Sequence, residues 1–221
     1  MSYLVRLTLP DEPGALGEVA QALGLVGANI ASLDVVEQHS DGVVDDLVVE
    51  LPEGALPDVV LTAVHAVDGA HIDSLRPFYG TIDHRDQVEM LAALAAQADS
   101  TPRTLERLLD VMPGILTATW GIVLDVGDDA RRVAASESAP QDNGERPEDV
   151  GLRRARVIDP EEDWVPESWA LLETELAGAP LPGTGLVVVL GRTGGPGFLP
   201  REVSHLGNVA TVVGGLLRRC P

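Results

Sequence analysis

The order of the hydrophobic patterns over residues 3–78 constrains the fold more than any other feature of this sequence. Alternation of apolar and polar residues predicts strands, and apolar residues spaced at i, i+3 and i+4 predict helices. The patterned runs are, in order, a strand at 3–9, a helix at 15–25, strands at 29–38 and 43–51, a helix at 58–67 and a strand at 71–78. The expected order is therefore βαββαβ.

Proline and glycine separate these runs. Pro10, Pro13 and Gly14 follow the first strand, Gly27 follows the first helix, and Pro57 precedes the second. Such residues end regular structure because proline fixes φ and glycine tolerates conformations that other residues avoid. Two βαβ units with right-handed crossovers give a four-stranded antiparallel sheet with two helices on one face. We therefore expect a ferredoxin-like domain over residues 1–80.

A second domain is expected over residues 86–221, with the boundary near 81–85. Its patterns predict helices at 88–95, 105–112, 168–176 and 200–219, and strands at 121–126, 132–135, 155–158 and 185–190. The first two strands form a hairpin, and residues 191–197 form a glycine-rich loop. The fold class is therefore α+β, with a second domain whose antiparallel sheet is bracketed by helices.

The charge of the chain excludes several functions. The formal net charge is -20, from 15 basic and 35 acidic residues, and none of the basic residues is lysine. Nucleic acids and anionic membranes require clustered positive charge, so we expect neither as a partner. Without lysine the chain lacks a P-loop lysine and a Schiff-base lysine. The acidic pair Asp45–Asp46 is expected to lie on a solvated face.

The sequence also indicates where in the cell the protein is expected. Residues 1–8 lack the basic start and apolar run of a signal peptide, and no apolar stretch is long enough to span a bilayer. The one cysteine, Cys220, has no partner for an internal disulfide. We expect a cytoplasmic protein.

The segment Asp11-Glu12-Pro13-Gly14-Ala15-Leu16 is the most informative motif. The N–H groups of Ala15, Leu16 and Gly17 would be unpaired at the helix start, which suits them to an α-carboxylate. Gly14 would let a ligand approach the backbone. Asp11 could accept an α-ammonium group, and the amide of Asn29 could bind either charge. The pattern is consistent with a bound amino acid.

These residues, with Gly27-Ala28-Asn29-Ile30 and Leu33, resemble the ACT domain family over residues 3–78. The resemblance implies a small-molecule sensor, usually of amino acids, that dimerises and binds its ligand between the helix-start loop and the second strand. The ligand-binding residues that it implies are Asp11, Gly14, Ala15, Leu16, Asn29 and Ile30.

The second region resembles GAF-like sensory domains. The resemblance rests on the bracketing helices, the hairpin at 120–124 and 132–135, and the strand at 186–192 that precedes Phe198. It implies a sensory or interaction domain with a second pocket between the sheet and the loops. Trp164 and Trp169 would lie beside that pocket or, alternatively, pack in the core.

No catalytic motif is recognised. The 5 histidines are scattered, and neither a metal site nor a cofactor is implied. The expected function is that of a non-catalytic regulatory homodimer. It would bind an amino acid and signal through its assembly or through a protein partner. The alternative is a dimerisation scaffold, with the same two domains, that has no small-molecule ligand.

Overall fold

The computed structural model describes residues 1–40, 42–78, 84–96, 101–127, 130–144 and 149–218. The chain divides into two compact units, Met1–Ile82 and Asp83–Pro221. Residues 81–83 of the expected boundary region and Cys220 lie outside the described residues. No helix within the described ranges is both long and apolar enough to cross a membrane.

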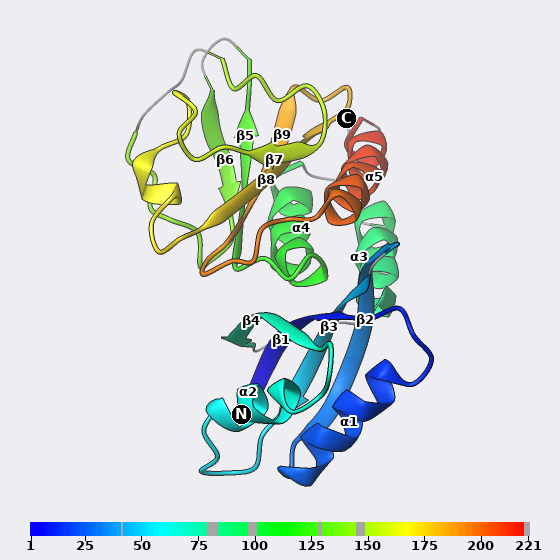
Figure 1. The fold of residues 1–221 in the computed structure, drawn as a ribbon. Helices are drawn as coiled ribbons and strands as arrows, with labels where there is room; N and C mark the ends of the chain where they lie inside the picture. The colour runs from blue at the N-terminus through cyan, green and yellow to red at the C-terminus, as the bar shows by residue number, and fades with distance from the viewer. Residues whose placement is uncertain (41, 79–83, 97–100, 128–129, 145–148, 219–221) are drawn as a thin grey trace. The chain divides into compact units, whose positions relative to one another are not determined.

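The first unit has the predicted βαββαβ order. Its elements are β1 (Ser2–Leu9), α1 (Ala15–Leu25), β2 (Asn29–His39), β3 (Gly42–Glu50), α2 (Asp58–His65) and β4 (His71–Pro77). The strands lie in the order β2-β3-β1-β4, and every neighbouring pair is antiparallel. This is the ferredoxin-like arrangement. Figure 1 shows α1 and α2 on the same side of this sheet.

The core of the first unit lies between the sheet and its helices. Alternate residues of β1 point into it because side chains on a strand alternate between the two faces. The buried members of this core are Tyr3, Val5, Leu7, Leu9, Val19, Leu23, Leu47, Val49, Leu51, Val60, Ala63 and Val64. The central strands β1 and β3 supply half of them, and β2 and β4 form the edges of the sheet.

The second unit is built around a five-stranded antiparallel sheet. Its elements are α3 (His84–Ala96), α4 (Thr101–Ile115), β5 (Trp120–Asp125), β6 (Arg131–Ala135), β7 (Arg156–Ile158), a 3-10 turn (Glu167–Trp169), β8 (Glu175–Leu181), β9 (Leu186–Arg192) and α5 (Pro200–Leu217). The strand order is β6-β5-β9-β8-β7. The predicted antiparallel sheet, bracketed by helices, is confirmed.

Each face of this second sheet has its own core. Residues of α3, α4 and α5 pack with Val123, Val188 and Leu190 on one face. On the other face Ile122 and Val189 pack against residues from the loop between β6 and β8. The sheet is therefore a middle layer with helices on one side and irregular chain on the other (Figure 1).

The predicted helix at 168–176 is wrong. Only a single 3-10 turn forms, at Glu167–Trp169, and Leu172 and Glu173 have φ of 59° and 53°, which ends any right-handed helix. The strand β8 that follows was missed because its sequence, ELAGAPL, contains residues with low strand propensity. Packing in the folded chain overrides that propensity. Gly178 lets Leu152 and Ile158 pack against this strand, since a Cβ on Gly178 would meet them at 2.7 and 2.9 Å.

The glycine-rich segment 191–197 also differs from the prediction, because Gly191 and Arg192 belong to β9. Gly191 lies directly against the indole of Trp120, so no larger residue fits there. Arg192 is fully buried and donates hydrogen bonds to the carbonyl of Leu116 at 2.7 Å and to Glu202 at 2.5 Å. Its guanidinium therefore connects β9, the end of α4 and the start of α5.

Candidate functional site

The loop that joins β1 to α1 forms an open helix start. The N–H of Glu12 donates to the carbonyl of Pro10 at 2.8 Å, and Gly14 has φ of 105°, a value that favours glycine. Nothing lies within 4 Å of a Cβ placed on Gly14, so the dihedral angle and not packing requires glycine there. No side chain caps α1. The first turn therefore has no side-chain cap among the described residues.

Two of the three predicted N–H donors are available. Among the described residues, no acceptor is recorded for the N–H groups of Leu16 and Gly17. The N–H of Ala15 differs from the prediction because it already donates to the carbonyl of Glu12 at 3.3 Å. The positive end of the helix dipole adds to these two donors, so the start of α1 can bind an anion.

Asp11 lies at the same end of the unit, but its carboxylate is engaged. Asp11 Oδ2 accepts a hydrogen bond of 2.8 Å from the side-chain amide of Gln38, near the end of β2. Both side chains are exposed. The contact fixes the β1–α1 loop to the end of the edge strand and occupies one oxygen of the predicted ammonium acceptor.

Asn29 and Ile30 lie elsewhere. Asn29 begins β2, and its amide donates to Glu50 Oε2 at 3.1 Å. The partly buried Ile30 packs against the core of the unit. A strand rises about 3.3 Å per residue, so the nine-residue step from Asn29 to Gln38 spans about 30 Å. One copy of the unit therefore brings together Asp11, Gly14, Ala15 and Leu16, but not Asn29 or Ile30.

The expected solvated pair Asp45–Asp46 is buried, with exposed fractions of 3% and 2%. Asp46 Oδ1 and Oδ2 accept hydrogen bonds of 2.8 and 2.7 Å from Arg6 on β1. Asp45 Oδ1 has no hydrogen-bond partner in the part of the chain that the structure describes. Sequence reasoning missed both roles, although two acidic residues inside an otherwise apolar run of β3 were a signal.

In the second unit the tryptophans pack in the core. The rings of Trp120 and Trp164 each meet that of Trp169 edge to face, with centroids 5.9 and 6.1 Å away. Glu162 accepts hydrogen bonds from Arg156 and from the Trp164 indole, and these contacts lower its pKa from 4.5 to about 2. This agrees with the packing alternative.

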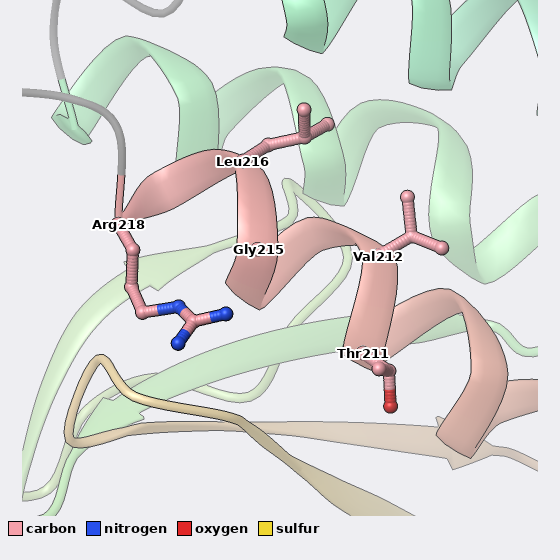
Figure 2. Close-up of a pocket in the computed structure, with 5 residues that line it drawn as sticks. All are labelled: Thr211, Val212, Gly215, Leu216 and Arg218. Carbon is pink, nitrogen blue, oxygen red and sulfur yellow. The ribbon is translucent and has the colours of Figure 1, made fainter.

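A hollow of about 430 Å³ lies instead on the surface of α5 (Figure 2). Gly215 forms its middle, with Val212 and Leu216 on one side and Thr211 and Arg218 on the other. The described residues of its lining are mostly apolar and include no carboxylate. Among the described residues no group of three or more His, Cys, Asp or Glu side chains is placed to hold a metal ion.

Comparison with known proteins identifies the first unit. Residues 3–69 match the family model described as the ACT domain, so the chain contains an ACT domain at its N-terminal end. This confirms the resemblance seen in the sequence. An ACT domain points to a regulatory, ligand-binding role. No curated protein matches the chain.

Several solved structures are similar to the chain. A GAF domain from a phosphoenolpyruvate-protein phosphotransferase of Coxiella burnetii has 11% identity and a TM-score of 0.44, and covers 61% of this chain and 94% of its own. Free methionine-R-sulfoxide reductase from Neisseria meningitidis has 12% identity and a TM-score of 0.48, with coverages of 64% and 95%. A GAF domain/HD domain protein from Geobacter sulfurreducens has 16% identity and a TM-score of 0.42, with coverages of 58% and 95%.

Two of these structures carry the name GAF domain, the family that the sequence of the second region resembles. All three TM-scores lie below 0.5, a level at which likeness assigns no activity. One of the three proteins is a reductase, so the absence of catalysis stays a prediction.

Proposed function

We propose that residues 1–80 bind an α-amino acid at the start of α1, and that the site is completed between two copies of the chain. The observation that carries this proposal is the uncapped first turn of α1, where the N–H groups of Leu16 and Gly17 have no acceptor among the described residues. Backbone donors at the positive end of a helix suit the carboxylate that every α-amino acid carries.

A second copy supplies what one copy lacks. The strand β2 is an edge of its sheet, and Leu33 and Val35 on it are 40% and 43% exposed. An exposed edge strand with apolar side chains is suited to pairing with another strand. Two copies of β2 related by a two-fold axis pair antiparallel, so the start of each strand lies beside the end of the other. Asn29 of one copy then lies near Asp11 of the other.

The whole chain is proposed to be a cytoplasmic, non-catalytic regulator. Amino-acid binding between two first units would stabilise one arrangement of the homodimer over another, and that preference is what a ligand needs to transmit a signal. The second unit, over residues 86–221, would act as the GAF-like sensory or interaction domain and would contact a protein partner. The alternative is a scaffold that dimerises through β2 without any ligand, which the exposed apolar edge also favours.

A thermal-shift screen of the full chain against the proteinogenic amino acids tests the proposal. A ligand present at about 100 times its Kd stabilises the folded state by about 2.7 kcal/mol, which is readily measured. Asn29→Ala should weaken the response to the selected amino acid at least tenfold. Asn208→Ala, an exposed amide on α5, is the matched control and should leave the response unchanged.

The outcomes separate the two functions. A selective response that requires Asn29 supports the sensor. A dimer in sedimentation experiments that responds to no amino acid supports the scaffold and overturns amino-acid binding. An unaltered response in Asn29→Ala places the ligand site away from the interface between copies.

A further inference from the structure

Asp45 lies on the helix-covered side of the first sheet. It is directly opposite Leu7 of β1 and Val35 of β2 in the two ladders. Residues directly opposite one another in an antiparallel ladder point to the same face, and Leu7 belongs to the core under the helices. Helix α1 joins β1 to β2, the two strands that flank β3, so it crosses the face on which Asp45 points.

Asp45 is a buried carboxylate: it is 3% exposed, and within the described residues no donor reaches its Oδ1. Burial raises the pKa of Asp45 above its ordinary value, and the negative charges of Asp46 and Asp34 raise it further. A buried polar group left without a hydrogen bond costs about 1–3 kcal/mol. Asp45 therefore weakens the folded state as it stands.

The neighbouring carboxylate shows what a structural role requires. Asp46 is equally buried but points to the other face, where Nε and Nη2 of Arg6 donate hydrogen bonds to its two oxygens. That pair is complete within the fold. Asp45 has the same side chain, one residue away, on a face where the described residues offer it no cation.

Asp45 also lies toward the end of the sheet at which β1 turns into α1. Val43, two positions earlier on β3, pairs with Leu9, the last residue of β1 before the loop. Two residues of strand span about 7 Å, so Asp45 is near the level at which the chain turns into α1. Val35, its neighbour on β2, is 43% exposed, so the layer under α1 is accessible from this edge of the sheet.

We infer that Asp45 receives the ammonium group of the bound amino acid, while the N–H groups of Leu16 and Gly17 hold its carboxylate. This inference rests on the proposed function and replaces Asp11 as the ammonium acceptor, since Asp11 is exposed and already bonded to Gln38. The bound ammonium completes the hydrogen bonding of a buried carboxylate. Compounds that have the carboxylate but no amino group lose this contact, so Asp45 makes the site selective for amino acids.

The experiment compares two ligands on three forms of the full chain. The ligands are the amino acid selected in the screen and the 2-hydroxy acid with the same side chain, titrated by calorimetry. The wild type should bind the amino acid at least tenfold more tightly than the hydroxy acid. Asp45→Asn should bind the amino acid at least tenfold more weakly than the wild type and should no longer distinguish the two ligands.

The control is Asp73→Asn, an exposed carboxylate on β4 bonded to Thr8, which should bind both ligands like the wild type. Without ligand, Asp45→Asn should unfold at an equal or higher temperature than the wild type, because a buried charge has been removed. Should Asp45→Asn fail to fold, Asp45→Leu fills the same core position with an apolar side chain. It is expected to lose binding while gaining stability.

Each result has one consequence. Wild-type affinity and selectivity in a folded Asp45 variant overturn this inference and leave the proposed function intact. A wild type that binds none of the amino acids overturns the proposed function and this inference together. Loss of selectivity in Asp45→Asn but not in Asp73→Asn supports both.

Discussion

Glu202 on α5 faces the fully buried guanidinium of Arg192, and we expect its removal to be severely destabilising. One Glu202 oxygen accepts from Arg192 at 2.5 Å, and the other accepts from the N–H of Leu199 at 2.8 Å, which caps α5. Glu202→Ala removes both contacts. Breaking a buried ion pair costs about 3–5 kcal/mol, and losing a helix cap about 1 kcal/mol.

The loss in the free energy of unfolding caused by Glu202→Ala should lie near the lower end of these ranges. Arg192 keeps hydrogen bonds to Leu116 and Thr117, and its guanidinium lies 4.0 Å from the centre of the Phe198 ring. We therefore expect a loss of about 4 kcal/mol in the free energy of unfolding. With a typical urea dependence of about 2 kcal/mol per molar, the midpoint of unfolding should fall by about 2 M.

Tryptophan fluorescence during urea unfolding is the assay, because all 3 tryptophans of the chain lie in the second unit. The control is Arg131→Ala, which breaks an exposed ion pair with Asp125 in the same unit, at 3.2 Å and with Arg131 65% exposed. Exposed pairs contribute about 0.2–1 kcal/mol. A shift for Glu202→Ala no larger than that of Arg131→Ala would mean that the Arg192–Glu202 contact contributes no more than an exposed ion pair.

Two further predictions concern the second unit. Leu172 is 79% exposed and has φ of 59°, a conformation that asparagine tolerates better than leucine. Leu172→Asn should therefore raise the free energy of unfolding by about 0.5–1 kcal/mol in the same assay. No gain would mean that the turn is unstrained. The hydrogen bonds from Arg156 and Trp164 lower the pKa of Glu162 from 4.5 to about 2, so the stability that it contributes is present above 4.5 and lost as the pH falls toward 2. Glu162→Gln should therefore lose less stability than the wild type between about pH 6 and about pH 3, and an equal loss would contradict the origin of the shift.

The fold of the first unit was predictable because its signals are local. The bounds expected for α1, 15–25, are those of the structure, since Pro13 and Gly14 precede the helix and Gly27 follows it. The strand β8 was not predictable in this way. It forms because Gly178 lets Leu152 and Ile158 pack closely, and those contacts come from residues 20 or more positions away.

The candidate site was half predictable. The open start of α1 follows from the sequence, because the motif before it lacks a side chain that caps the first turn. The separation of Asp11 from Asn29 was implied by the βαββαβ order, since a strand that follows α1 begins at the opposite end of the sheet from the β1–α1 loop. Asp45 could not be assigned from its sequence neighbours, because a pair of aspartates is usually solvated.

Arg192, Asp46 and Asp45 are all buried and ionisable, and what surrounds each indicates its role. Arg192 donates hydrogen bonds to a carbonyl, a hydroxyl and Glu202. Asp46 accepts hydrogen bonds from Nε and Nη2 of Arg6. The folded chain itself therefore stabilises these two charges. Asp45 is also buried, but none of the described residues donates a hydrogen bond to its Oδ1. In the proposed site the ammonium group of the ligand, and not the fold, would supply the missing positive charge.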